Sequence, residues 1–117
     1  ELKLNLILDL NESVVRADER MLRQAVLNIL RNAAEAVQGQ GSVFVKVKDQ
    51  AIEIRDTGNG IPADQLSKIF IPFFTTKAKG HGIGLALAHR IVTEHGGTLT
   101  AANSPEGGAV FTISLPA

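Results

Sequence analysis

The feature that most constrains the fold is an apolar pattern that recurs at steps of three and four residues between Asp18 and Gly39. This period places the apolar side chains on one face of an α-helix. Asp18 is a favourable N-cap residue and Gly39 a favourable terminator, so we predict one helix between them. The apolar face consists of Leu22, Ala25, Val26, Ile29, Leu30, Ala33 and Val37. A helix with a single apolar face needs a second layer to cover it.

Alternating apolar and polar residues predict a sheet as that second layer. Asp49-Gln50 joins two of the alternating segments into a predicted hairpin. The predicted strands are residues 2–8, 42–48, 51–56, 98–102 and 109–115, with a further short strand at 14–17.

Two further segments are predicted to be helical. Ala63–Phe70 follows a turn-rich patch, and a last helix begins near Ile83 and stops at Gly96-Gly97. Residues 71–82 lack periodicity and predict a mobile loop. We therefore expect a single α+β domain over residues 1–117, a two-layer α/β sandwich. About three helices would cover one face of a mixed, mostly antiparallel sheet.

Composition narrows the function. The 117 residues carry a formal net charge of zero and no cysteine. We therefore expect no nucleic-acid partner, no direct membrane contact, and neither disulfides nor thiolate sites. The longest apolar run, Leu6–Leu8, is far too short to span a bilayer. A cytoplasmic location is predicted. Because the chain opens at Glu1 without an initiator Met, we expect a piece of a longer protein.

Polar residues line up along the long predicted helix. Gln24, Asn28, Asn32 and Glu35 follow one another at steps of four, four and three. Asparagine is a mediocre helix former, and its amide oxygen is a ligand for a hard cation such as Mg²⁺. Two asparagines on a solvated face are at least an equal explanation of this pattern alone.

A turn with two glycines follows the strand that ends at Asp56. A carboxylate there is an acceptor suited to the amino group of a purine. Gly58 and Gly60 would let the main chain pass close beside a flat ring. A plain strand-to-helix turn explains the same residues.

Closely spaced glycines precede the last predicted helix. Gly80, Gly82 and Gly84 would expose main-chain N–H groups at the positive end of the helix dipole, which favours phosphate. The spacing matches neither the P-loop nor the dinucleotide fingerprint. A flexible hinge is the alternative.

Residues 70–77 hold three of the five phenylalanines. Aromatic residues in a loop either attach it to the core or dock onto a partner. Lys77 and Lys79 could reach phosphates as point charges. The three histidines share no metal-ligand spacing and are expected to be surface or capping residues.

The order of these motifs resembles the catalytic domain of bacterial sensor histidine kinases. The resemblance runs from about Leu4 to Pro116 and includes a closing strand, Gly108–Thr112 through Leu115-Pro116. Thr75-Thr76-Lys77 is similar to the nitrogen-regulation branch. The N box, first glycine box, F box and second glycine box correspond to Asn28/Asn32-Ala33, Asp56-x-Gly58-x-Gly60, Phe70-x-Pro72-Phe73-Phe74 and Gly82-x-Gly84-Leu85.

The resemblance implies the Bergerat fold shared with DNA gyrase, Hsp90 chaperones and MutL, with ATP and Mg²⁺ as cofactors. It implies that Asn32 binds Mg²⁺, that Asp56 accepts from the adenine amino group, and that Thr112 lies nearby. Residues 80–85 would follow the phosphates, and residues 72–79 would form a lid. The implied catalytic residues are Asn28 and Lys77. The implied nucleotide-binding residues are Asn28, Asn32, Asp56, Gly58, Gly60, Ile61, Phe73, Thr75, Thr76, Lys77, Gly80, His81, Gly82, Ile83, Gly84, Leu85 and Thr112.

Departures from related families favour phosphate transfer over hydrolysis. The ATP-hydrolysing members of the fold carry a water-activating glutamate where this chain has Asn28, and an amide cannot act as a general base. Some kinases carry a basic residue in place of Glu35. The family's phosphoacceptor histidine lies in an upstream helical hairpin with a His-Glu or His-Asp signature, which His81, His89 and His95 lack.

The predicted partners are therefore the dimerisation and histidine-phosphotransfer helices of the same parent protein and, indirectly, a response regulator. The fragment itself is expected to be monomeric. Three alternatives stay open: a hydrolase of the gyrase or MutL type, a serine kinase of the anti-sigma-factor type, and a nucleotide-sensing module without transfer. The Phe-x-Pro-Phe-Phe segment is absent from the anti-sigma group.

Overall fold

The computed structural model describes residues 3–10, 19–37, 40–72 and 84–116. Five strands form one sheet in the order β1-β2-β3-β5-β4. β1 is parallel to β2, and the other neighbouring strands are antiparallel, so the sheet is mixed and mostly antiparallel as predicted. The strands are β1 Lys3–Leu10, β2 Gln40–Lys48, β3 Ala51–Asp56, β4 Thr98–Asn103 and β5 Ala109–Ser114.

The predicted hairpin joins β2 to β3 through a two-residue turn. Asp49 and Gln50 have φ of 51° and 64°. Positive φ at both central residues is the geometry that matches the right-handed twist of the flanking strands.

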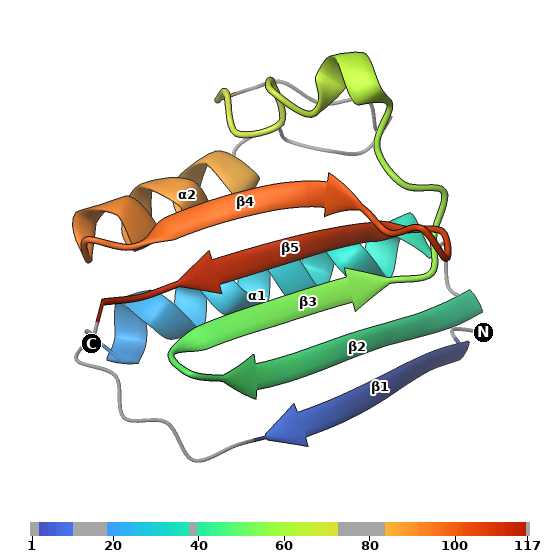
Figure 1. The fold of residues 1–117 in the computed structure, drawn as a ribbon, viewed down its shortest axis with the longest axis horizontal. Coiled ribbons are helices and arrows are strands. Elements are labelled where there is room, and N and C mark those ends of the chain that lie inside the picture. The colour runs from blue at the N-terminus through green and yellow to red at the C-terminus, as the bar shows by residue number, and fades with distance from the viewer. Residues whose placement is uncertain (1–2, 11–18, 38–39, 73–83, 117) are drawn as a thin grey trace.

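Two α-helices cover the same face of the sheet, as Figure 1 shows. They are α1, Glu19–Ala36, and α2, Gly84–Glu94. Ala25, Ile29 and Ala33 of α1 are fully buried, so the predicted apolar face forms the core. The two-layer α/β sandwich is therefore confirmed. Within the described ranges, no helix has the length and apolarity needed to cross a bilayer.

Glycine ends α2 at the predicted place. Gly96 has φ of 79°, Gly97 N–H donates to the Val92 carbonyl over 3.0 Å, and Gly96 N–H donates to Thr93 over 2.9 Å. This pair of bonds is the Schellman arrangement, which satisfies the last carbonyls of a helix.

The prediction of a helical stretch at residues 63–70 is mostly wrong. Only one 3-10 turn forms, η1, Ala63–Gln65, followed by further turns. Gln65 N–H donates to the Pro62 carbonyl over 2.8 Å and Lys68 N–H to Gln65 over 2.9 Å, so each bond spans three residues and not four. Such tight turns do not extend far. The described helical layer therefore has two α-helices where about three were expected.

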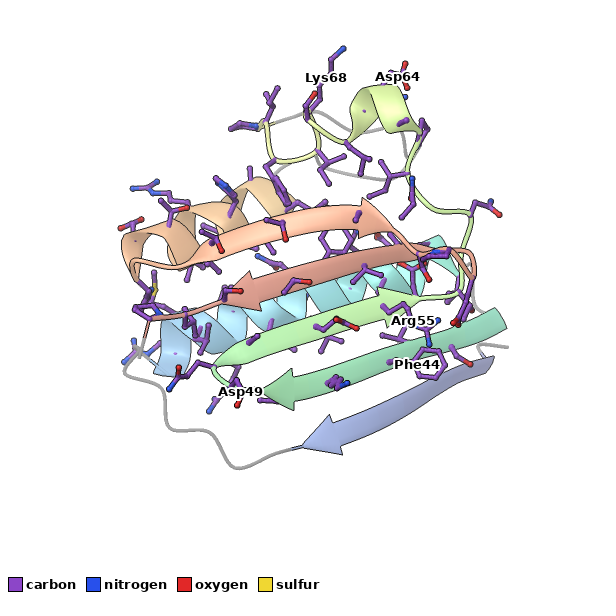
Figure 2. The ribbon with its side chains drawn as sticks, viewed as in Figure 1. Phe44, Asp49, Arg55, Asp64 and Lys68 are labelled. Atoms are coloured by element: carbon purple, nitrogen blue, oxygen red, sulfur yellow. The ribbon has the colours of Figure 1, made fainter. Side chains whose placement is uncertain are left out.

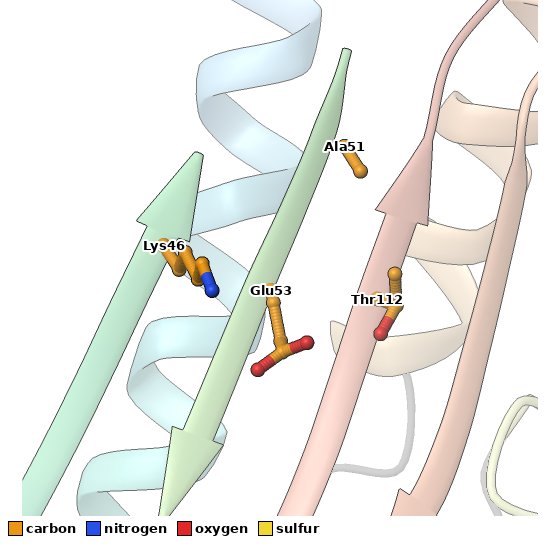
Figure 3. Close-up of a pocket in the computed structure, with 4 residues that line it drawn as sticks. All are labelled: Lys46, Ala51, Glu53 and Thr112. Carbon is orange, nitrogen blue, oxygen red and sulfur yellow. The ribbon is translucent and has the colours of Figure 1, made fainter. Parts of the chain in front are cut away.

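The other face of the sheet carries polar and aromatic side chains. The Arg55 guanidinium lies 4.2 Å from the Phe44 ring centroid, and Figure 2 shows both side chains on neighbouring strands. Lys46, Ala51, Glu53 and Thr112 line a shallow depression on this face (Figure 3). The predicted strand at 14–17, the Asp18 cap and most of the loop at 71–82 lie outside the described residues.

Candidate nucleotide-binding site

Asp56 is the last residue of β3, and 1% of its surface is exposed. It points to the helical layer because strand residues alternate and Ile54, two positions earlier, lies in the core. Its Oδ1 accepts from Gly58 N–H over 2.8 Å and from Ala109 N–H over 3.2 Å. Its Oδ2 is buried without a partner among the described residues. A buried carboxylate oxygen in that state is costly unless a ligand donates to it.

The glycine turn after Asp56 packs closely on its surroundings. A Cβ on Gly58 would lie 2.5 Å from the Ala36 carbonyl oxygen, so the turn contacts the C-terminal end of α1. Gly60 has φ of 79°, and a Cβ there would lie 2.8 Å from Asn103 Oδ1. Glycine is therefore needed at both positions for contacts with the protein itself.

Asn28 lies inside the molecule, with 7% of its surface exposed. Its Oδ1 accepts from Gln24 Nε2 over 3.3 Å, whereas its Nδ2 is buried with no partner among the described residues. The solvated-face explanation is therefore wrong for Asn28. Asn32, one turn later on α1, is half-buried.

The elements that carry these residues meet on one side of the domain. α1 contacts both β3 and α2. In Figure 1, α1 and β3 end on the same side of the molecule, and α2 begins on the side towards them. Gly84 and Leu85 open α2, and Ile61, half-buried, packs against the core. The other predicted phosphate and lid residues lie outside the described residues: Phe73, Thr75, Thr76, Lys77, Gly80, His81, Gly82 and Ile83.

Thr112 does not lie beside the Asp56 carboxylate, contrary to the prediction. Along β5, Ala109, Phe111 and Ile113 are buried beneath the helices, so the alternation turns Thr112 to the opposite face. There it pairs with Glu53 and lines the depression described above.

Three residues near Asp56 were missed from the sequence. Ala109 provides the N–H group that binds Oδ1. Gly108 precedes it with φ of 85°, and a Cβ there would overlap the Asp56 carbonyl oxygen. Asn103 binds the main chain of Ile61. The Gly107-Gly108 pair before a small residue was the available signal, because such pairs mark close main-chain approach.

Phe70 attaches the beginning of the phenylalanine-rich segment to the core. Its ring stacks on His89 of α2 at a centroid distance of 5.0 Å and meets Phe111 edge-on at 6.4 Å. His95 Nδ1 lies 2.7 Å from the Ile91 carbonyl, a capping contact as expected. In the described ranges, no group of three or more His, Asp or Glu side chains is placed to hold a metal ion.

Comparison with known proteins agrees with this geometry. Residues 17–117 match the family described as histidine kinase-, DNA gyrase B- and HSP90-like ATPases. The chain belongs to this family. As a member of this ATPase family, it is an ATP-binding domain of the kind found in sensor histidine kinases.

Two individual members of this ATPase family are similar in sequence to most of the chain. It is 45% identical over 114 residues to the signal transduction histidine-protein kinase AtoS of Escherichia coli, covering 93% of this chain and 19% of AtoS. It is 40% identical to the nitrogen regulation protein NtrY of Azorhizobium caulinodans, covering 87% of this chain and 15% of NtrY. The chain therefore spans less than a quarter of either relative.

Solved structures show the same fold. The catalytic domain of histidine kinase ThkA superimposes with a TM-score of 0.86 at 32% identity, covering 97% of this chain and 80% of that one. The predicted fold class and the resemblance to sensor kinases, including the nitrogen-regulation branch, are thus confirmed.

Proposed function

We propose that this chain binds ATP with Mg²⁺ and presents the γ-phosphate to a histidine on another domain of its parent protein. The observation that carries the proposal is a pair of buried polar atoms without partners among the described residues, Asp56 Oδ2 and Asn28 Nδ2. One is an acceptor and the other a donor. A nucleotide supplies the complementary groups, an amino group on the purine and oxygens on the phosphates.

Asp56 favours adenine over guanine. Its Oδ1 is already occupied by two main-chain N–H groups, so Oδ2 is the acceptor left for a base. The 6-amino group of adenine donates to such an oxygen, whereas the 6-carbonyl of guanine would repel it. Discrimination of this kind is strong because the buried acceptor stays unpaired with the wrong base.

Asn32 fits the requirements of Mg²⁺. Its side chain follows Asn28 by one turn of α1 and carries an amide oxygen, a ligand that hard cations accept. Bound Mg²⁺ would neutralise charge on the phosphate oxygens. Lys77 would add a positive charge from the lid.

Asn28 supports transfer over hydrolysis. Its amide holds a donor in the buried site but cannot take a proton from water, so this chain lacks the general base of the hydrolysing relatives at that position. A neutral histidine imidazole needs no such base. Its nitrogen would bond to the γ-phosphorus as the bond to the bridging oxygen of ADP breaks, and the domain would contribute positioning and charge stabilisation.

The proposed partners follow from the relatives, whose chains extend far beyond the matched part. They are the dimerisation and phosphoacceptor helices of the same parent protein and, through them, a response regulator. The proposed location is the cytoplasm.

Transfer of labelled phosphate tests the proposal. This chain is mixed with the separately produced upstream helices of the parent protein, Mg²⁺ and ATP labelled at the γ-phosphate. We expect acid-labile label on a histidine of the helices, lost when Mg²⁺ is chelated and reduced in Asn32→Ala. Release of free phosphate without labelled histidine would instead assign the chain to the hydrolases. ATP binding without either product would leave a sensing module.

A further inference from the structure

We propose that Asn103, the last residue of β4, is a positioning residue for the nucleotide. Its carboxamide holds the main chain at Ile61 and thereby fixes the far end of the turn that begins at Asp56. The inference rests on the proposed ATP binding and adds a residue outside the sequence motifs.

The contact is a pair of short hydrogen bonds between positions 42 residues apart. Asn103 Oδ1 accepts from Ile61 N–H over 2.7 Å, and Asn103 Nδ2 donates to the Ile61 carbonyl over 2.7 Å. One carboxamide therefore satisfies both main-chain groups of one residue. Aspartate offers the acceptor without the donor, and alanine offers neither.

The turn needs external support because residues 57–62 form no helix or strand. Its first end is held by Asp56 Oδ1, which binds the N–H groups of Gly58 and Ala109. Its second end is held by Asn103. With both ends fixed, the main chain beside Asp56 keeps one shape in the absence of ligand.

Asn103 and the Ala109 N–H that holds Asp56 Oδ1 belong to the same hairpin. Asn103 and Ala109 are directly paired in the β4–β5 register. Their connection is braced internally, since Ser104 N–H donates to the Gly108 carbonyl over 2.9 Å and Gly107 N–H to the Ser104 carbonyl over 3.0 Å. Figure 1 shows this connection at the end of the sheet where β3 finishes. The hairpin thus acts as a rigid clamp across the Asp56 turn.

Loss of the contact between Asn103 and Ile61 would weaken nucleotide binding, because ordering the turn would then cost binding free energy. Without Asn103, the Ile61 end becomes free in the unliganded chain and must be ordered when ATP binds. Asn103 is exposed, so each of the two hydrogen bonds lies in the lower part of the usual net range, and losing both corresponds to about tenfold weaker binding.

Calorimetric titration of the folded chain with ATP and Mg²⁺ tests this directly. We expect Asn103→Ala to bind about tenfold more weakly than the wild type, and Asn103→Asp also to bind more weakly, because its carboxylate faces the Ile61 carbonyl. Thr100→Ala is the matched control: Thr100 lies on the same strand, is exposed, and pairs with Thr112 on the opposite face of the sheet. Its affinity should equal that of the wild type.

Amide hydrogen exchange of the unliganded wild type provides a second measurement, which does not depend on whether a variant folds. The Ile61 N–H should exchange far more slowly than in an unstructured peptide. Exchange of the Ile61 N–H at the rate of an unstructured peptide would overturn the inference. This result would count even if Asn103→Ala did not fold.

Two affinity results separate this inference from the proposed function. A lower melting temperature in Asn103→Ala with unchanged ATP affinity would reduce Asn103 to a structural residue and overturn the inference. Absence of ATP binding in the wild type would overturn the proposed function and with it the positioning role.

Discussion

The main-chain N–H of Ala109 donates to Asp56 Oδ1 over 3.2 Å, across 53 positions of sequence. Because Gly58 N–H binds the same oxygen over 2.8 Å, the protein itself orients the carboxylate. Its other oxygen, Oδ2, is left buried without a partner among the described residues. Ala109, the first residue of β5, therefore helps to orient the Asp56 carboxylate at the end of β3.

We expect Asn28 to lower the stability of the unliganded chain and to strengthen its binding of ATP. We expect Asn28→Leu to stabilise the unliganded chain by about 1 kcal/mol, because a side chain of similar size removes a buried donor that has no described partner. The melting temperature should rise by roughly 4 °C. ATP affinity should fall at least about tenfold because the donor is lost.

Gln24→Leu is the control for that experiment. Gln24 is exposed and donates to Asn28 Oδ1, so its replacement removes the Gln24–Asn28 bond and leaves Asn28 Nδ2 in place. Thermal unfolding and ATP titration are measured on both variants. A lower melting temperature in Asn28→Leu than in the wild type would contradict the assignment of Nδ2 as an unpaired donor.

Gly108 is required by contact as well as by conformation. Gly107 and Gly108 have φ of 99° and 85°, so alanine at either position is strained by roughly 1–2 kcal/mol. A Cβ on Gly107 meets nothing within 4 Å, whereas one on Gly108 overlaps the Asp56 carbonyl. Gly108→Ala should therefore lower the free energy of unfolding by at least about 3 kcal/mol.

Urea unfolding of the two alanine variants isolates that contact. Because both carry the conformational strain, the difference between them reports the overlap with Asp56. Equal losses in the two variants would mean that the Gly108 main chain does not lie against Asp56 in solution.

Local patterns predicted most of the fold. The period of the residues on α1 and the turn at Asp49-Gln50 are determined within a few neighbours, and both were confirmed. Residues 63–70 were not, because a run of tight turns and a short helix have similar sequences. The identity of the Asp56 neighbour was missed for a different reason.

That neighbour depends on strand parity. A shift of one position turns a side chain to the other face of a sheet, so Thr112 and Ala109 have opposite orientations although they lie three residues apart. The resemblance to the kinase family alone had predicted Thr112 in the nucleotide site. The apolar alternation of Ala109, Phe111 and Ile113 could have indicated that Ala109 faces the helices together with Asp56. The Asn103–Ile61 contact had no such signal, since it joins segments 42 residues apart.

The most direct test of the account is ATP titration of the wild type, Asp56→Asn and Glu53→Gln in the presence of Mg²⁺. Both variants neutralise a carboxylate on β3, but Glu53 is exposed on the opposite face of the sheet. We predict that Asp56→Asn weakens binding by about 100-fold, because an amide can place a donor against the adenine amino group, and that Glu53→Gln binds like the wild type. Wild-type affinity in Asp56→Asn would contradict the central claim that the buried Asp56 carboxylate recognises the purine.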